Sequence, residues 1–255
     1  MDTITEDSYI LVYRDRRRRW IVRPRDSPKL HTHLGILDCK ALVGREFGLR
    51  VKTTLDDDLL ILQPTIEDLV LKLARKTQVI YPKDLGMIVV KCGIHSGSKV
   101  VETGTGSGAT TALLAYLVRP EGHVYTYDVN PEFQDLAKKN LERLGLLDVV
   151  TFKIGDSRQG LEEKGMDAGV LDLGDPWEVV RPMRGSLKPS GVLAVVTPTT
   201  NQAEKLVQKM REEGFVAIET MEILLRHLEA RVGMTRPSNA MVGHTAYLTF
   251  GRSTV

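Results

Sequence analysis

The pattern of apolar and polar positions changes near residue 66. Before that point, short apolar strings alternate with turn residues, which is typical of β-strands; the strings cover residues 9–12, 20–22, 49–51 and 59–62. No helical period of useful length occurs among them, so residues 1–65 are predicted to form a small β-rich domain. Residues 66–74 change to helical spacing, and we expect a second domain over residues 66–255.

Strands and helices alternate along the rest of the chain. The predicted strands cover residues 99–102, 124–127, 149–154, 168–171, 191–196, 215–225 and 246–250. The predicted helices cover residues 85–94, 109–118, 131–144 and 201–213, and one more starts near Trp177. This alternation predicts an α/β fold, in which helices cover both faces of a largely parallel sheet. No helix separates the last two strands, so they should pair antiparallel at one edge.

The composition fits a globular protein that does not cross a membrane. It is 42% hydrophobic and 27% charged, and no stretch approaches the roughly 18 uninterrupted apolar residues that a spanning helix needs. The acidic, polar start of the chain does not resemble a secretory signal peptide. Two cysteines, Cys39 and Cys92, are too few for a disulfide framework, so we expect a cytoplasmic protein.

The charge is nearly balanced, and a net charge of +2 does not by itself indicate a nucleic-acid partner. Its distribution adds one feature, because arginines crowd a short segment: Arg14, Arg16, Arg17, Arg18, Arg19, Arg23 and Arg25. They form either a solvated hairpin or a surface that faces phosphate groups, and the sequence leaves both interpretations open.

A glycine-rich turn follows the strand predicted over residues 99–102. It reads Glu-Thr-Gly-Thr-Gly-Ser-Gly-Ala over residues 102–109. Glycines between a strand and a helix allow a sharp bend and let a ligand approach the backbone. The spacing also satisfies G-x-G-x-x-A, so a nicotinamide dinucleotide is one ligand to consider.

Carboxylates follow three successive predicted strands. Glu102 precedes the first glycine, where it can face an ammonium group, and Asp128 ends the next strand, where it can accept both hydroxyls of a ribose. Asp156 ends the third strand, within reach of the exocyclic amine of an adenine. Any one of them could simply be a helix cap. Their order suits an amino acid, a ribose and an adenine in turn, and it resembles the class I S-adenosylmethionine-dependent methyltransferases.

This resemblance implies a Rossmann-like, seven-stranded sheet with an antiparallel last strand, and S-adenosylmethionine as the cofactor. The cofactor-binding residues that it implies are Gln78, Glu102, Gly104, Thr105, Gly106, Ser107, Gly108, Asp128, Asp156, Ser157 and Asp172.

Asp172 is also the candidate catalytic group. It opens the string Asp-Leu-Gly-Asp-Pro-Trp, and amino-methylating members of the class carry an acidic or amide residue there, beside proline and an aromatic residue. A carboxylate at this place can accept an N–H of the substrate and offset the positive charge that develops on methylation. The alternative role, a helix N-cap, fits Asp175 better, because Pro176 would then take the first helical position.

Four further strings narrow the resemblance. They are residues 31–38 (His-Thr-His-Leu-Gly-Ile-Leu-Asp), residues 78–84 (Gln-Val-Ile-Tyr-Pro-Lys-Asp), residues 171–177, and Arg236-Pro237 followed by residues 243–247 (Gly-His-Thr-Ala-Tyr). Together with the glycine loop they resemble the tRNA (adenine-N1)-methyltransferase family that modifies position 58. One departure is Gly174, where the family more usually has proline or a larger residue.

The narrower resemblance implies a homotetramer that methylates the T-loop of tRNA, and it leaves open whether a neighbouring adenine is methylated too. It also implies that Tyr81 is catalytic and lies near the target base or the methionine end of the cofactor. Pro82 requires an extended Tyr81, whose ring could stack on a flipped adenine; the alternative is a hydrophobic staple. Candidate RNA contacts, chosen by position alone, are Lys83, Arg226, Arg231 and Arg236.

Two other sites fit the sequence less well. His31, His33, Asp38 and Cys39 lack a second group of ligands at zinc-finger spacing, so no metal is expected there. His244 could pass for a general base, but N1 of adenine already carries a free lone pair and needs none.

Two other functions are weaker alternatives. A non-catalytic RNA-binding subunit would not need the carboxylates at the strand ends. A nicotinamide-dependent oxidoreductase would leave Asp156 and residues 172–177 without a role.

Overall fold

The structure is a computed structural model that describes residues 3–76 and 78–255. It divides into two compact units, of which one ends at Lys72 and the other starts at Leu73. Helix α1 (Ile66–Leu71) belongs to the N-terminal unit by its contacts, whereas the sequence pattern predicts a second domain that starts at residue 66. Thr65 and Asp68 start α1 with a capping box, in which each side chain binds the other residue's backbone N–H.

The N-terminal unit is rich in β-structure, as the sequence predicts. Its antiparallel sheet has the order β2-β1-β6-β5, and the strands are β1 (Ile10–Tyr13), β2 (Arg19–Val22), β5 (Arg50–Lys52) and β6 (Asp58–Leu62). Alternate residues of β1 and β6, namely Ile10, Val12, Leu59 and Ile61, are buried in one hydrophobic core.

A hairpin of β3 (Lys29–Thr32) and β4 (Gly35–Asp38) was missed by the apolar pattern. It contains most of the string at residues 31–38. Gly35 has a φ of +107°, and a Cβ there would come within 2.8 Å of Thr53 Oγ1, so the turn needs glycine. Thr32 Oγ1 accepts a hydrogen bond from the Leu34 amide and donates to the Gly35 carbonyl. This string therefore stabilises a turn.

The C-terminal unit contains a seven-stranded sheet in the order β12-β15-β11-β10-β7-β8-β9. The strands are β7 (Lys99–Thr103), β8 (His123–Asp128), β9 (Val150–Ile154), β10 (Met166–Leu171), β11 (Leu187–Thr197), β12 (Val216–Glu222) and β15 (Tyr247–Arg252). Strand β15 pairs antiparallel with both β11 and β12, and the pairs β11–β10, β10–β7, β7–β8 and β8–β9 are parallel. The predicted α/β class and the antiparallel last strand are confirmed.

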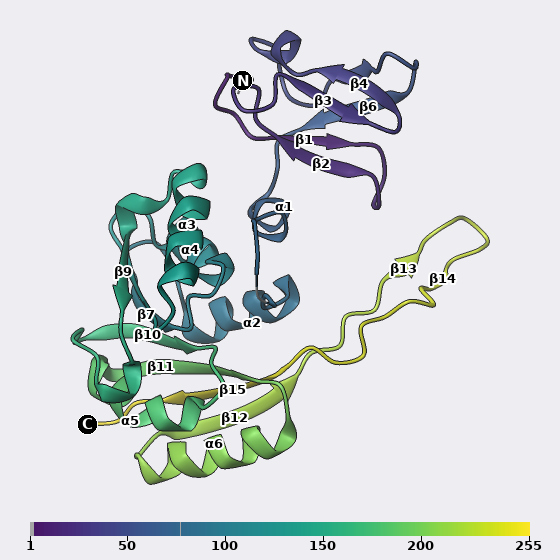
Figure 1. Cartoon of the computed structure of the whole chain (residues 1–255). Helices are drawn as coiled ribbons and strands as arrows, with labels where there is room; N and C mark the ends of the chain where they lie inside the picture. Colours follow the sequence, from purple (N-terminus) through teal and green to yellow (C-terminus); the bar gives the residue numbers. More distant parts are fainter. Residues whose placement is uncertain (1–2, 77) are drawn as a thin grey trace. The chain divides into compact units, whose positions relative to one another are not determined.

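Helices cover both faces of this sheet (Figure 1). Helices α2 (Pro82–Cys92), α3 (Ala109–Val118) and α4 (Pro131–Leu144) lie on one face, and α5 (Val180–Ser186) and α6 (Thr200–Glu212) lie on the other. The limits of α4 follow from its ends, because Asn130 caps it, Pro131 takes the first position and Gly145 ends it in a left-handed conformation. Beneath α5 and α6, Val101, Met183, Leu193 and Leu206 belong to one buried cluster.

Short 3₁₀ helices complete the connections: η1 (Lys40–Leu42), η2 (Leu147–Val149), η3 (Ser157–Gln159) and η4 (Pro176–Val179). Among the described residues, none of the helices is long and apolar enough to span a bilayer.

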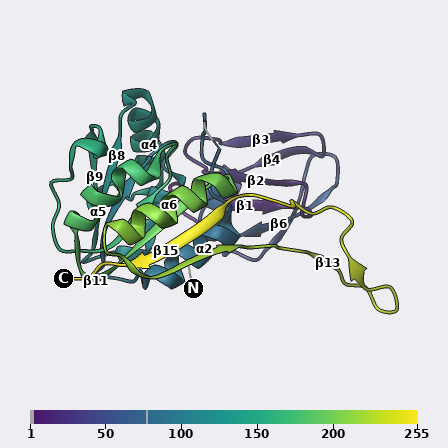
Figure 2. The same ribbon diagram turned by 90° about the horizontal axis from the view of Figure 1, so that it is seen from below.

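A long hairpin leaves the sheet between β12 and β15 and extends well past its end (Figures 1 and 2). This segment, residues 223–246, is called the arm below, and it carries the short strands β13 (Leu228–Glu229) and β14 (Arg236–Pro237). The strands predicted over residues 215–225 and 246–250 account for β12 and β15, but the hairpin itself was not predicted. Its apolar residues follow no regular period, and most of them are exposed.

Candidate functional site

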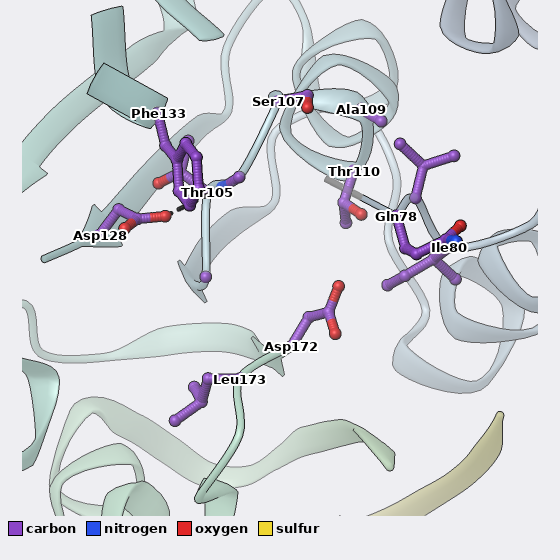
Figure 3. Close-up of a pocket in the computed structure, with 13 residues that line it drawn as sticks. Gln78, Ile80, Thr105, Ser107, Ala109, Thr110, Asp128, Phe133, Asp172 and Leu173 are labelled. Carbon is purple, nitrogen blue, oxygen red and sulfur yellow. Dashed lines mark hydrogen bonds between the residues drawn. The ribbon is translucent and has the colours of Figure 1, made fainter. Parts of the chain in front are cut away.

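A pocket of about 330 Å³ opens where β7, β8 and β10 end, which is where open α/β sheets bind their ligands. Its walls come from the glycine loop, the strand ends and the segment before α2 (Figure 3). The lining residues are Gln78, Val79, Ile80, Gly104, Thr105, Gly106, Ser107, Ala109, Thr110, Asp128, Phe133, Asp172 and Leu173. Seven of the eleven predicted cofactor residues thus line this one pocket.

The glycine loop is shaped by two close approaches. Gly104 has a φ of +94°, and a Cβ there would lie 2.0 Å from the carbonyl oxygen of Asp172. Gly108, at φ +79°, starts α3, and a Cβ there would lie 2.9 Å from Cβ of Ala137 on α4. No side chain fits at either position, so the loop backbone forms the floor of the pocket.

Glu102 lies beneath this floor and is only 1% exposed. Its Oε2 accepts hydrogen bonds from Thr111 Oγ1 at 2.6 Å and from Thr126 Oγ1 at 2.7 Å. Its Oε1 is buried and has no hydrogen-bond partner among the described residues. Burial raises the pKa of Glu102 to about 7, and the charges of Asp172 and Asp128 add to that rise against the two hydroxyl hydrogen bonds.

Asp128, at the end of β8, holds the loop from the other side. Its Oδ2 accepts a hydrogen bond from the Gly106 amide at 3.0 Å, and its Oδ1 accepts one from the Asn130 amide at 2.9 Å. The Gly106 N–H, which could face a phosphate in a dinucleotide site, is therefore already bound to a carboxylate. Both oxygens of Asp128 keep further lone pairs for a ligand.

Asp172 projects into the pocket from the end of β10, below Thr110 in Figure 3. The surrounding protein raises the pKa of its carboxyl group to about 6. The residue is nevertheless open to solvent through the pocket mouth, so water still reaches the carboxylate. Asp172 is thus a solvent-accessible acid in a largely protein environment, which suits a group that meets the substrate.

These acids make the pocket a site for a cation. Asp128 and Asp172 line it and Glu102 lies buried beneath it, and desolvation by burial is the main cause of the raised pKa values of Glu102 and Asp172. A sulfonium or an ammonium group would stabilise the ionised form of these acids, whereas the pyrophosphate of a nicotinamide dinucleotide would be repelled by it. The unpartnered Oε1 of Glu102 and the glycine floor therefore fit S-adenosylmethionine.

A second hollow of about 200 Å³ continues past Asp128 and contains Asp156 and Ser157. Gly104, Asp128 and Leu173 line both hollows, so the two form one elongated site. Asp156 caps η3 by accepting from the Arg158 amide, and its two oxygens also bind Nε of Arg158. This contact lowers the pKa of Asp156. Asp156 therefore caps a helix and also lines the hollow, so the helix cap does not exclude the predicted contact with an adenine.

Residues 78–80 form the wall that faces the glycine loop, and this wall contains the predicted Gln78. Tyr81 follows it as the N-cap residue of α2 and has the extended backbone that Pro82 requires, with φ −69° and ψ 150°. Its side chain is 43% exposed and lies outside the pocket lining. The ring is therefore exposed, and its residue follows directly on the pocket wall.

The loop after Asp172 is held from α6. Gln202 Nε2 donates to the Gly174 carbonyl at 3.2 Å, and the Lys205 ammonium lies 3.9 Å from the ring centre of Trp177. Asp175 occupies the N-cap position of η4 with Pro176 next, but its side chain makes no capping hydrogen bond. These contacts with α6 hold the loop in place, although its Gly174 departs from the family pattern.

The four predicted RNA contacts fall into two groups. Lys83 is largely buried, and its ammonium binds Asp84 and Thr245, so its role in this structure is internal. Arg226, Arg231 and Arg236 are exposed and lie on the arm, where Arg236 also pairs with Glu229.

His244 lies at the base of the arm, outside the pocket lining. Its Nδ1 is 2.6 Å from Glu222 Oε1 and its Nε2 is 2.8 Å from the Pro198 carbonyl. Both partners can only accept, so the ring donates from both nitrogens as an imidazolium, and the same contacts raise its pKa. A doubly bound imidazolium is no general base.

The N-terminal arginines are mostly paired with aspartates. The ion pairs are Arg14–Asp57, Arg18–Asp15, Arg19–Asp68, Arg23–Asp26 and Arg25–Asp7. Five of the seven are thus neutralised, which favours the solvated hairpin over a surface that faces phosphates.

Residues 31–39 contain the histidines and the cysteine for which no metal is expected, and two of these residues have other neighbours. His33 packs near Trp20, with ring centres 6.3 Å apart, and Cys39 is buried in the N-terminal core. In the described part of the chain, no three His, Cys, Asp or Glu side chains are grouped so that they could hold a metal ion.

Six residues that line the pocket were not predicted from the sequence: Val79, Ile80, Ala109, Thr110, Phe133 and Leu173. All six are neutral residue types with no chemical signal of their own. Position could have found two of them, because Thr110 and Phe133 lie in the first turns of α3 and α4, and these turns follow the strand ends that carry the acids.

Comparison with known proteins places these features in context. Residues 59–235 match the family model described as the GCD14 subunit of the tRNA methyltransferase complex. The tRNA (adenine(57)-N(1)/adenine(58)-N(1))-methyltransferase TrmI of Methanocaldococcus jannaschii is 36% identical over 96% of this chain and 95% of its own. The tRNA (adenine(58)-N(1))-methyltransferase TrmI of Thermus thermophilus is 32% identical over 93% and 94%.

Solved structures agree over the full length. The tRNA (m1A58) methyltransferase TrmI from Aquifex aeolicus has a TM-score of 0.86 and 30% identity, covering 100% of both chains. A structure described as a SAM-dependent O-methyltransferase from Thermotoga maritima has a TM-score of 0.93 and 35% identity, covering 100% of this chain and 96% of its own.

Proposed function

The chain belongs to the family of the GCD14 subunit of the tRNA methyltransferase complex, and we infer from this that it transfers a methyl group from S-adenosylmethionine to N1 of adenine 58 in tRNA. The family predicted from the sequence is confirmed. The observation that carries the activity is the acid-lined pocket with Asp172 open at its mouth.

In this proposal, different pocket residues bind different parts of the cofactor. The buried Oε1 of Glu102 accepts from the ammonium group, Asp128 accepts from the ribose hydroxyls, and the hollow beside Asp156 takes the adenine ring. When bound, S-adenosylmethionine supplies a methyl group on a positively charged sulfur. The glycine floor lets the ligand lie against the backbone and excludes water from beneath it.

Asp172 orients the acceptor. Its carboxylate accepts a hydrogen bond from the exocyclic amine of the target adenine, which points the N1 lone pair into the pocket. As N1 gains its methyl group the ring becomes positively charged, and the same carboxylate offsets that charge. N1 lies on the pairing edge of adenine, so the base must leave its tertiary contacts first, and in this proposal the exposed Tyr81 ring stacks on it.

The arm supports a homo-oligomer, and we propose a tetramer. A two-stranded hairpin is marginally stable alone in water, yet this one carries many exposed apolar side chains: Leu224, Leu225, Leu228, Val232, Met234, Met241 and Val242. A second copy of the same arm would cover them. Arg226 and Arg231 would then remain near tRNA phosphates, and the enzyme would work with its substrate in the cytoplasm.

The two alternative functions lose support. A non-catalytic RNA-binding subunit has no use for a formed pocket lined by Asp128 and Asp172 above a buried Glu102, and an oxidoreductase that binds a pyrophosphate is disfavoured by the same charges.

The direct test is primer extension on unmodified tRNA after incubation with S-adenosylmethionine. A methyl group on N1 blocks pairing, so reverse transcriptase stops one nucleotide before it; the map also shows whether position 57 is modified. Asp172→Asn should lower kcat by about 100-fold or more, the order expected when a group that stabilises developing charge is lost. Asp135→Asn, an exposed acid on α4, is the matched control. No stop from a protein that binds S-adenosylmethionine would mean a different acceptor, such as an oxygen atom.

A further inference from the structure

Two strings that stood out in the sequence meet in the fold, although about 160 residues separate them. Lys83 and Asp84 lie in the first turn of α2, and Thr245 lies near the end of the arm. The Lys83 ammonium lies 2.7 Å from Asp84 Oδ1 and 2.6 Å from Thr245 Oγ1, and Thr245 Oγ1 donates to Asp84 Oδ2 at 2.8 Å. These three side chains close a ring of hydrogen bonds, which is called the lock below.

The lock is buried, and its residues have little contact with water. The side chain of Asp84 is 1% exposed and that of Lys83 is 9% exposed. A buried ion pair of this kind adds little net stability compared with apolar packing, because desolvation offsets its attraction. What it provides is one specific geometry, since all its hydrogen bonds must be satisfied together.

The geometry of the lock determines where one wall of the cofactor pocket, residues 78–80, lies. The Tyr81 carbonyl accepts hydrogen bonds from the amides of Asp84 and Leu85, both at 2.9 Å, so the lock residue Asp84 is joined directly to the end of the wall. Residues 78–80 belong to no helix or strand, and their position depends on how the first turn of α2 is held. In Figure 3, Gln78 and Ile80 lie beside Thr110, on the far side of the pocket from Asp128.

The base of the arm is fixed at the same place. His244, next to Thr245, bridges Glu222 at the end of β12 and the Pro198 carbonyl just after β11. The arm therefore leaves the sheet from a point that is tied both to the sheet and to α2.

We propose that Lys83, Asp84 and Thr245 are positioning residues, which hold the wall at residues 78–81 in register with the base of the arm and so make cofactor binding depend on how the arm is seated. The inference rests on the proposed function only for the identity of the ligand. A change in how the arm is seated would then move the wall at residues 78–81, although no arm residue lines the pocket.

The test removes the Thr245 hydroxyl and measures cofactor binding and catalysis separately. Thr245→Val should weaken S-adenosylmethionine binding and lower kcat, each on the order of tenfold, because small displacements of binding groups cost rate steeply. The KM for tRNA should stay near the wild-type value, since the substitution itself removes no phosphate contact. Thr245→Ser keeps both hydrogen bonds and should restore binding. Amide exchange at residues 78–81, measured without cofactor, should be faster in Thr245→Val alone.

Thr220→Val is the matched control, because it removes a threonine hydroxyl that binds Thr249 in the same sheet, away from the pocket. The proposal is overturned if Thr245→Val binds S-adenosylmethionine and turns over like wild type, or if Thr220→Val loses as much. Should Thr245→Val fail to fold, Thr245→Ala gives the same comparison. A wild-type protein that binds S-adenosylmethionine but leaves tRNA unmethylated would contradict the proposed function only. The role of the lock would still be tested by calorimetry of cofactor binding and by amide exchange.

Discussion

The carboxyl group of Glu102 makes the pocket sensitive to pH. Its pKa in the free protein is about 7 because it is buried, compared with 4.5 when it is exposed. A raised carboxyl pKa means that the folded protein favours the proton, so this contribution to stability is present at low pH and is lost as pH rises through about 7. A bound ammonium group favours the carboxylate instead. We therefore predict that S-adenosylmethionine binds more tightly at about pH 7.5 than at about pH 6, with release of a proton.

Isothermal titration calorimetry in buffers of different ionisation enthalpy measures both effects. Glu102→Gln should weaken binding by about tenfold at the higher pH, the scale of one hydrogen bond to a charged group, and should flatten the pH dependence. Glu142→Gln, an exposed glutamate on α4, should behave as wild type. An unchanged pH dependence in Glu102→Gln would assign the effect to another acid, with Asp172 the next candidate.

Single residues were predictable from sequence where their chemistry is distinctive and their position is fixed by the sheet. Glu102, Asp128 and Asp172 end strands that run parallel, so their approach to one another follows from the topology. Thr245 and Asp84 carried no such information, because their contact depends on how α2 packs against the antiparallel strand β15, which no local pattern encodes.

At the scale of elements, the base of the arm depends on the charge of His244. With acceptors at both ring nitrogens, the imidazolium is favoured and the pKa lies above the ordinary 6.5, although nearby Lys83 opposes this. A raised histidine pKa stabilises the fold below the ordinary value, and that contribution is lost as pH rises through the folded pKa. We predict that Glu222→Gln lowers the pKa of His244, as followed by NMR titration of the imidazole resonances.

The His244→Gln spectrum identifies the resonance among the six histidines. Amide exchange at the base of the arm should rise in Glu222→Gln, once corrected for intrinsic rates, at a pH where wild type is still protected. A His244 pKa at or below 6.5 in the wild type would contradict the double-acceptor geometry.

Helices and strands could be predicted from the sequence where their apolar residues repeat regularly and where residues typical of helix ends mark their limits. Helix α4 begins and ends where Asn130, Pro131 and Gly145 predict, whereas α2 begins three residues before the predicted start because Pro82 takes its first position. The β3–β4 hairpin and the arm were missed for a common reason. Their strands are only two to four residues long, which is too short for a periodic pattern to stand out in the sequence.

At the scale of the whole molecule, the arm accounts for much of the apolar surface of the C-terminal unit. Val232 is fully exposed, and Leu228 and Met234 are 58% and 68% exposed. Isolated exposed side chains are normal, but a run of them on a thin hairpin indicates a surface that another chain covers. If a second copy covers it, the association should be sensitive to charge placed on β13 and insensitive to the same charge elsewhere.

We predict that Leu228→Glu shifts the proposed tetramer towards smaller species in size-exclusion chromatography with light scattering, because a buried unpaired carboxylate opposes association. Leu55→Glu is the control, since Leu55 is 67% exposed on the N-terminal unit and should tolerate the change. If the lock links the arm to the pocket, Leu228→Glu should also weaken S-adenosylmethionine binding, although its site is far along the arm. A wild-type protein that runs as a monomer, or a Leu228→Glu variant that stays tetrameric, would refute the arm as the interface and leave the pocket assignments unchanged.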